Sequence, residues 1–251
     1  MKTIRKRLEP TGGADPKVRL IPIGDIHLGA PWCREDLLRE TVAYAARVGA
    51  YVIGMGDYAE SATRTSQGDG FTEQIMDLDE QITTLAAILS PIRERFLGLV
   101  GGNHGRRTRE HARFDQDRLL AKLLDVPYMG KGQAALILAV EKQLYRVHFW
   151  HGKSGAMTLG GKLNAAMRGG KNMQCDVSLM GHVHDIIVGS ELMMTPDPTH
   201  GVNERKKTYG CTGGFYRWCD SYAEEYGYPP GKAGVLKIEL FANRWDIHVS
   251  E

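Results

Sequence analysis

Long hydrophobic runs are missing from this sequence. No apolar stretch approaches the roughly 18 residues that a membrane-spanning helix needs. The basic N-terminal segment, residues 1–7, is not followed by the apolar core of a secretory signal. These two absences exclude a membrane partner and predict a cytoplasmic protein.

Cysteine is scarce, with four residues in a chain of 251. None of them forms a C-x-x-C pair or a zinc-ribbon spacing, and four cysteines do not make a disulfide framework in a chain of this length. We therefore predict free thiols in a reducing compartment, with a pair between Cys211 and Cys219 as the alternative.

An excess of one charge is also lacking, because the formal net charge is only +2. A nucleic-acid partner would therefore have to be recognised by local clusters rather than by overall charge. Internal repeats, low-complexity tracts and long linkers are absent as well. The length then suits one domain over residues 17–251, preceded by a mobile lead-in at 1–16 that has room for a short edge strand.

The first half of the chain alternates between extended and helical patterns. Short apolar runs predict buried strands, and apolar residues at helical spacing predict helices after them. This alternation favours parallel strands joined by right-handed crossovers. The strands are predicted over 18–24, 51–55 and 96–100, and the helices over 34–48, from an N-cap at Thr72 to about Pro91, and around Leu119 to Leu124.

The pattern changes in the second half, where two apolar runs joined by a short polar turn predict a hairpin. We expect an α/β protein with a second, more antiparallel sheet packed on the first. The Pro-containing residues 195–204 are predicted to be a loop. The remaining strands are predicted over 134–140, 145–150, 175–180, 186–188, 207–212 and 235–241, with a helix over 157–168.

Side chains of metal-ligand type follow five of the predicted strands. Because the carboxyl ends of strands in an α/β sheet converge on one crevice, these distant residues should meet in space. Their mixed oxygen and nitrogen donors, without thiolate, suit Mn²⁺ first, and Fe, Zn²⁺ or Ni²⁺ as alternatives. The residues are Asp25 and His27, then Asp57, Asn103 and His104, His151, and His182 and His184.

Each of these residues has a structural alternative when taken alone. Asp57 follows a glycine and suits a helix N-cap, Asn103 suits a turn, and His151 suits a hydrogen-bonded strand end. Together they favour one site, since each alternative needs its own coincidence. The other four histidines fit no strand end and are predicted to be structural or superficial: His111, His148, His200 and His248.

The five segments resemble the calcineurin-like metallophosphoesterase superfamily. The resemblance rests on Gly24-Asp25-x-His27, Gly56-Asp57, Gly102-Asn103-His104, His151-Gly152 and Gly181-His182-x-His184, in this order. It implies a four-layer α/β/β/α sandwich of two mixed sheets. The late segments Thr212-Gly-Gly-Phe215 and Tyr228-Pro-Pro are similar to the small members encoded by phages, a less specific likeness.

The resemblance also implies a role for each residue in a dinuclear centre. Asp25, His27 and His184 would hold one ion, Asn103, His151 and His182 the second, and Asp57 would bridge both. Two such cations neutralise phosphoryl oxygens and lower the pKa of a bridging water, so that hydroxide attacks the ester near neutral pH. His104, beside the ions, would contact the phosphoryl oxygen or act as general acid.

One position departs from the family pattern. An acidic residue usually follows this histidine and orients its ring, but here the residue is Gly105. Glu110 and Glu60 are the candidates for a substitute. The departure bears on the general-acid role of His104 and leaves the implied metal ligands unchanged.

Basic residues near the ligands suggest an anionic substrate. Arg106 and Arg107 follow His104 at a predicted helix start, where anions bind well, although a solvated helix face is the alternative. Lys153 and Arg168 lie in a segment without acidic residues and suggest a rim for DNA or RNA. The late aromatics suit base stacking or, with better odds, a packed C-terminal lobe: Phe215, Tyr216, Trp218, Tyr222, Tyr226 and Tyr228.

The sequence therefore predicts a two-metal phosphodiesterase, with DNA or RNA as candidate substrates. A phosphomonoesterase or a small cyclic-nucleotide phosphodiesterase is the alternative within the same chemistry. A catalytically inert interaction scaffold is the alternative from another class, and the full ligand set weighs against it. The oligomeric state does not follow from these residues.

Overall fold

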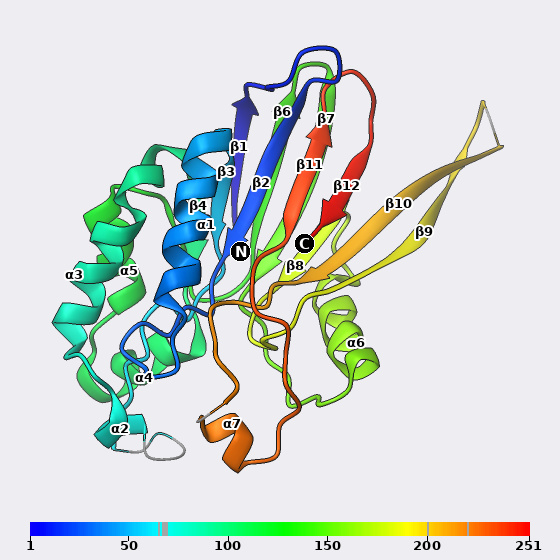
Figure 1. Ribbon diagram of the computed structural model, residues 1–251. Coiled ribbons are helices and arrows are strands. Elements are labelled where there is room, and N and C mark those ends of the chain that lie inside the picture. Colours follow the sequence, from blue (N-terminus) through cyan, green and yellow to red (C-terminus); the bar gives the residue numbers. More distant parts are fainter. Residues whose placement is uncertain (65, 67–69, 200, 220) are drawn as a thin grey trace.

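Two six-stranded sheets packed face to face form the centre of the protein (Figure 1). The computed structural model describes residues 1–64, 66, 70–199, 201–219 and 221–251. His200, predicted to be structural or superficial, lies outside these residues. The first sheet has the order β12 (Ile247–Ser250), β11 (Lys237–Phe241), β2 (Lys17–Ile23), β3 (Tyr51–Gly54), β4 (Phe96–Val100) and β5 (Tyr128–Gly130).

The second sheet lies behind the first and consists of the N-terminal strand and five strands from the second half of the chain. It carries a long hairpin at one edge and the N-terminal strand at the other. Its order is β1 (Lys2–Leu8), β6 (Ala134–Val140), β7 (Gln143–Trp150), β8 (Val177–Met180), β10 (Gly201–Cys211) and β9 (Ile187–Asp197).

Helices cover the outer face of each sheet, as Figure 1 shows. Against the first sheet lie α1 (Glu35–Val48), α3 (Leu78–Leu89), which continues into a 3₁₀ helix over Ser90–Arg95, and α5 (Gln116–Leu124). Against the second sheet lies α6 (Leu159–Gly170), whose Ala165 and Ala166 pack on Met180. Shorter helices lie near the strand ends: α2 (Gly70–Glu73), α4 (Asn103–Ala112) and α7 (Tyr222–Glu225).

The central strands β2, β3 and β4 of the first sheet are largely buried on both faces, which explains their continuous apolar runs. Leu20 points into the core between the two sheets, together with Leu136 and Phe149. Its neighbour Ile21 points to the opposite face and packs with Leu85 of α3. These two cores separate helix, sheet, sheet and helix into four layers, so the expected α/β/β/α sandwich of two mixed sheets is confirmed.

One expectation about the sheets is wrong. The second sheet is not more antiparallel, because each sheet has three parallel and two antiparallel pairings. The local hairpins suggested otherwise, but β8 inserts parallel to both β7 and β10. The lead-in contains the short edge strand for which it had room, because β1 pairs in parallel with β6 from Lys2 to Leu8. Its exposed basic side chains are typical of an edge strand.

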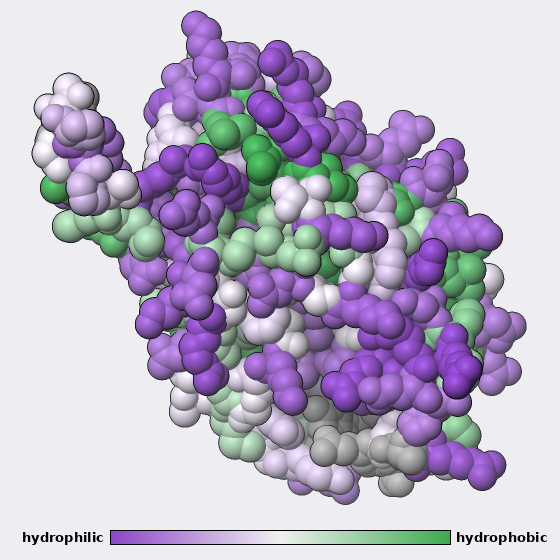
Figure 2. Space-filling model, turned by 180° about the vertical axis from the view of Figure 1, so that it is seen from behind, coloured by the Kyte–Doolittle hydropathy of each residue, from purple (hydrophilic) through white to green (hydrophobic). Residues whose placement is uncertain are grey.

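Two boundaries also differ from the expectation. Helix α3 begins at Leu78 after Asp77, not after Thr72, which belongs to the short α2. Residues 195–197 and 201–204, expected in a loop, extend β9 and β10 into an arm. Figure 2 shows this arm standing away from the body with hydrophobic and hydrophilic side chains mixed along it, among them the exposed Leu192 and Met194. Because the arm is exposed, its sequence lacks the alternation of apolar and polar residues that marks a half-buried strand.

The predicted chemistry of the cysteines is confirmed, because Cys33, Cys175, Cys211 and Cys219 are all free thiols. Among the described residues, the structure contains no helix with both the length and the apolar character needed to cross a bilayer.

Candidate metal centre

The predicted ligands meet at one edge of the sandwich. They follow β2, β3 and β4 of the first sheet and β7 and β8 of the second. The strands β2, β3 and β4 are mutually parallel, and so are β7 and β8, so each set delivers its side chains in one direction. Residues separated by more than 150 positions become neighbours there, since the backbone N–H of His182 donates to the Asp25 carboxylate at 2.9 Å.

The backbone turns sharply at these strand ends. Five ligand candidates have a positive φ although none is glycine: Asp25 (49°), His27 (53°), Asp57 (49°), His182 (70°) and His184 (47°). This left-handed conformation is uncommon for such residues and stores backbone strain, which typically persists where function requires a particular side-chain direction. Gly102 lets its backbone pack closely against Asp57, because a Cβ at position 102 would lie 2.0 Å from Asp57 Oδ1.

The first group of ligands consists of Asp25, His27 and His184, whose donor atoms lie within 4.8 Å of one another. His27 Nδ1 donates to the Glu60 carboxylate at 2.9 Å, so its Nε2 presents a lone pair to the site. Both His27 Nε2 and His184 Nδ1 are buried without a hydrogen-bond partner. Buried polar atoms are rarely left unpaired, and a cation between them would satisfy both.

The second group consists of Asp57, His151 and His182, again within 4.8 Å. Around His151 Nε2 lie Asn103 Oδ1 at 2.7 Å, Asp57 Oδ2 at 3.1 Å and His182 Nδ1 at 3.2 Å. Its other nitrogen, Nδ1, donates to the Met55 carbonyl at 3.1 Å. Electron-rich atoms converge on one point here, which is the arrangement that a divalent cation stabilises.

The carboxylates respond to this crowding in different ways. Burial alone would raise the pKa of Asp57, but His151 and His104 hold that pKa well below its usual value. Burial raises the pKa of Asp25 to about 6 against the opposing charge of His151. The pKa of His151 rises to about 9, because Asp57 and Asp25 outweigh the effect of burial. Positive charge is therefore favoured between the two carboxylates, as a proton or as a metal ion.

His104 begins α4 beside the two groups. Its backbone N–H donates to Asp57 Oδ1 at 2.9 Å, and its ring Nε2 lies 3.8 Å from Asp57 Oδ2. Burial lowers the pKa of its imidazole to about 4, so the ring is neutral near pH 7. His27, Asp57 and His104 also lie within 4.8 Å as a third group, so distance alone does not separate His104 from the ligands.

The residue that orients His104 is Glu60, through its backbone. The Glu60 carbonyl accepts from His104 Nδ1 at 2.5 Å, while its carboxylate serves His27. The other candidate, Glu110, is exposed and pairs with Arg106 at 2.6 Å. The sequence suggested Glu60 only as one of two candidates. Every residue has a backbone carbonyl, so residue type does not reveal which carbonyl accepts the hydrogen bond.

Gly105 is explained by a second acid that the sequence did not single out. A Cβ at Gly105 would lie 2.0 Å from Asp117 Oδ2, so the buried Asp117 carboxyl occupies the space of a side chain at 105. Asp117 pairs with Arg109 at 3.1 Å, and burial raises its pKa to about 7. It comes from α5, and only the packing of α5 on α4 brings it there.

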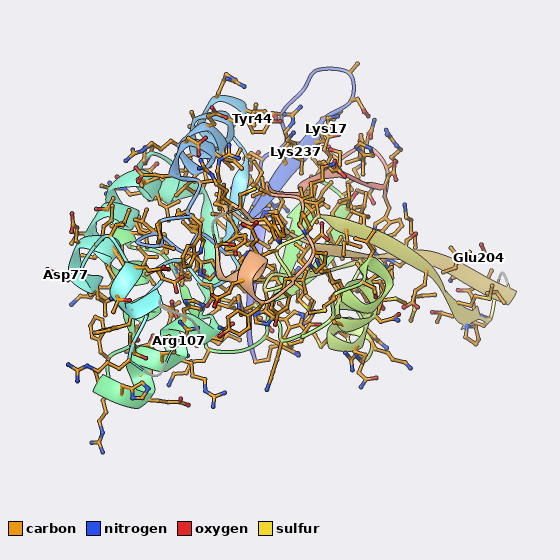
Figure 3. The ribbon with its side chains drawn as sticks, turned by 60° about the horizontal axis from the view of Figure 1, so that its bottom comes forward. Lys17, Tyr44, Asp77, Arg107, Glu204 and Lys237 are labelled. Atoms are coloured by element: carbon orange, nitrogen blue, oxygen red, sulfur yellow. The ribbon has the colours of Figure 1, made fainter. Side chains whose placement is uncertain are left out.

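A pocket of about 250 Å³ opens over the ligands. Of the predicted substrate-binding residues, Arg107 lines this pocket, and its guanidinium lies 3.8 Å from the Glu60 carboxylate. Figure 3 shows Arg107 on the α4 side of the molecule, apart from Lys17 and Lys237. Arg106, Lys153 and Arg168 are exposed and are not among the described residues that line the pocket, so the expected basic rim reduces to one arginine.

The late aromatics divide between the core and the pocket. Phe215 is fully buried against the first sheet, whereas Tyr216, Trp218 and Tyr228 line the pocket with Trp32. Tyr226 is exposed, and the side chain of Tyr222 lies outside the described part of the chain. Of the two alternatives that the sequence offered, the packed lobe describes Phe215, and base stacking stays a prediction for the three rings at the pocket. Trp32 has no signal in the sequence, because it joins this set only through tertiary contact.

Comparison with known proteins gives a likeness of fold alone. No family model matches the chain, and no curated protein matches its sequence. A conserved uncharacterized protein from Streptococcus pneumoniae TIGR4, described as a predicted phosphoesterase, is similar at 11% identity and a TM-score of 0.39, over 93% of this chain and 88% of that one. A double mutant of Vps29 from Entamoeba histolytica is similar at 11% identity and a TM-score of 0.41, over 93% and 97%. At these scores the likeness carries no argument, and the fold rests on the chain's own two sheets.

Proposed function

We propose that this chain is a dinuclear-metal phosphoesterase of the calcineurin-like metallophosphoesterase superfamily, of the small type found in phages, and that it hydrolyses phosphodiesters. One observation carries the proposal: two groups of ligand-type side chains lie side by side at the strand ends, with Asp57 at their junction and a pocket above them. Two ions bound there would polarise phosphoryl oxygens and lower the pKa of a water molecule.

The chain's own residues supply the rest of the chemistry. Asp57 anchors the start of α4 by accepting from the His104 N–H. His104 keeps Nδ1 on the Glu60 carbonyl and directs Nε2 towards the Asp57 side of the site. A phosphoester anion in the pocket would raise the pKa of this ring and favour the protonated form that donates to a leaving oxygen.

The diester is favoured because Arg107 is the one predicted substrate-binding cation that lines the pocket. A phosphodiester carries a single negative charge and a monoester up to two, so a monoesterase would gain more from further cations. DNA and RNA belong to this proposal as candidate substrates, as do the preference for Mn²⁺ and a cytoplasmic location, which the four free thiols support.

The test is an activity panel on the protein loaded with Mn²⁺, with metal content measured by mass spectrometry. The substrates are bis(p-nitrophenyl) phosphate, p-nitrophenyl phosphate, a cyclic nucleotide, and single- and double-stranded DNA and RNA. We expect two ions per chain and faster turnover of the diester than of the monoester. Faster turnover of the monoester would overturn the diester assignment, and bound ions without any activity would favour the inert scaffold.

A further inference from the structure

Four aromatic side chains form one side of the pocket over the ligands. We call Trp32, Tyr216, Trp218 and Tyr228 the aromatic wall. Trp32 follows the β2 turn, and the other three follow β10, which runs parallel to β8 and so carries the chain to the same edge. The two segments are joined, since the Arg217 N–H donates to the Trp32 carbonyl at 2.9 Å.

The aromatic wall adjoins the metal ligands directly. The ring centroid of Tyr216 lies 5.0 Å from that of His184 and 6.4 Å from that of Trp32, both in edge-to-face geometry. Trp218 Nε1 donates to the Tyr228 carbonyl at 2.6 Å, which fixes the indole and uses its single donor. What Trp218 presents to the pocket is therefore the apolar surface of its ring.

These rings are placed differently from an ordinary core aromatic. Phe215 is 0% exposed, whereas its neighbour Tyr216, Trp218 and Tyr228 remain only partly buried around a cavity. Apolar ring surface left towards a cavity gains free energy when a flat apolar ligand covers it. The wall is thus poised to stack a planar group next to the phosphoester site.

We propose that the aromatic wall is a stacking subsite for one nucleobase, so that the substrate is a nucleotidyl phosphodiester. This rests on the proposed function, since the phosphate lies at the ligands and Arg107 while the base lies on Trp218. Base stacking on aromatic side chains tolerates any base, because every base has a π face. A pocket of about 250 Å³ suits one nucleotide unit rather than several.

A sugar is the other flat ligand that aromatic rings commonly hold. Sugar recognition requires unpaired polar side chains that read hydroxyl groups. In the described lining the polar groups are mostly ligand candidates or already paired, as Lys162 is with Asp185 at 2.9 Å. The wall therefore favours a base.

The test compares two diesters that share charge and leaving group and differ in the nucleoside: the p-nitrophenyl ester of thymidine 5′-monophosphate and methyl p-nitrophenyl phosphate. The p-nitrophenyl ester of 1,2-dideoxyribose 5′-phosphate, which keeps the sugar and lacks the base, separates the base from the sugar. We expect the wild type to prefer the nucleotide ester in kcat/KM. Trp218→Ala should lower this preference roughly 5- to 150-fold, the range for the loss of one stacked base, and Trp218→Phe should retain most of it. Tyr226→Ala, an exposed aromatic that does not line the pocket, is the matched control.

Binding supplies a second readout that does not depend on turnover. By calorimetry on the Mn²⁺-loaded protein, thymidine 5′-monophosphate should bind the wild type more tightly than inorganic phosphate does. Trp218→Ala should remove that difference and leave phosphate binding unchanged. If Trp218→Ala does not fold, as judged by circular dichroism, Trp218→Leu replaces it.

The outcomes separate the two proposals. An unchanged substrate preference in a folded Trp218 variant overturns the base subsite, while hydrolysis of the methyl diester still supports the phosphodiesterase. If neither diester is cleaved, the proposed function fails, and calorimetry alone decides the subsite: equal affinity for the nucleotide and for phosphate overturns it.

Discussion

The two sides of the pocket are built in opposite ways. We call the seven predicted metal ligands the ligand wall, and all of them except Asp25 and His151 line the pocket. They come from the ends of five core strands, where Asp25 is 0% and Asp57 is 2% exposed. The aromatic wall comes from loops, and its rings at Tyr216 and Trp218 are only partly buried. The ligand wall has charged side chains on backbone with positive φ. In the aromatic wall, the Tyr216 ring contacts Trp32, and the Trp218 indole donates a hydrogen bond to Tyr228.

This difference follows from what each side would bind. Metal ligands must hold their donor atoms within a few tenths of an ångström, so they benefit from rigid strand ends and supporting hydrogen bonds. Stacking depends weakly on exact position, so loops suffice for it. We therefore expect changes in the ligand wall to act on metal and turnover, and changes in the aromatic wall to act on substrate choice.

The largest effect is expected at Asp57, which belongs to the second ligand group and lies within 4.8 Å of His27 of the first. Asp57→Asn removes the charge that we propose to bridge the two ions, so we expect loss of bound metal and a fall in diester turnover of roughly 10³-fold or more. Metal content and kcat/KM measure this, with the exposed Asp79→Asn as control. If the Asp57→Asn variant retained two ions at full affinity, Asp57 would not be the bridging ligand.

The next effect is expected at His104, which lies beside the ligand wall and would separate an effect on catalysis from an effect on metal binding. His104→Asn should keep both ions and lower turnover by roughly 10²-fold or more, the scale of general acid–base groups. Because His104 also lies within 4.8 Å of His27 and Asp57, loss of an ion in this variant would make it a ligand instead. Near-normal turnover would remove it from the mechanism.

Glu60 tests how far the support of the ligand wall matters. Its carboxylate accepts from His27 Nδ1, while its backbone carbonyl holds His104. Glu60→Gln keeps the carbonyl and weakens the carboxylate contact, so we expect metal affinity to fall about 10- to 100-fold, as for other groups behind a metal ligand. Metal titration measures this, with the exposed Glu40→Gln as control. Unchanged affinity would mean that His27 needs no such partner.

Gly105 tests packing beneath the ligand wall. Gly105→Ala forces a Cβ against the Asp117 carboxyl and should cost about 1–3 kcal/mol of unfolding free energy, as overpacking does. Asp117→Ala removes the clashing atoms, so the cost of Gly105→Ala should shrink in that background. Urea denaturation of the four-member cycle measures this, with Gly160→Ala, which meets nothing within 4 Å, as control. Additive effects would refute the contact.

The smallest effect is expected at His148, an ionisable group of the second sheet that is not one of the ligands. Burial lowers its pKa to about 4, below the value of about 6.5 in an unfolded chain, so the unfolded state takes up protons first. Its stabilising effect is complete above pH 6.5 and is lost as the pH falls towards 4. His148→Gln should therefore flatten the fall in melting temperature over this window, whereas the exposed His248→Gln should not. Identical pH profiles would contradict the low pKa.

The sequence by itself determined the strands that carry the ligands. The apolar runs before Asp25, Asp57 and Asn103 are short and continuous, largely buried and followed by glycine, so composition and spacing suffice to find them. The convergence of Asp25, His27 and His184 follows from the same rule about strand ends, and the structure brings them together. Local signals were strong wherever burial constrained every residue.

Only the tertiary structure decided what surrounds those ligands. The place of β1, the arm of β9 and β10, the Glu60 carbonyl at His104, Asp117 under Gly105 and the position of Trp32 all depend on contacts between distant segments. Such contacts leave no periodicity in sequence, because one residue meets one partner and neighbouring residues need not share its environment. The order of the strands in the sequence thus identifies the ligands. The packing of strands and loops in three dimensions determines which residues support the ligands and which line the pocket.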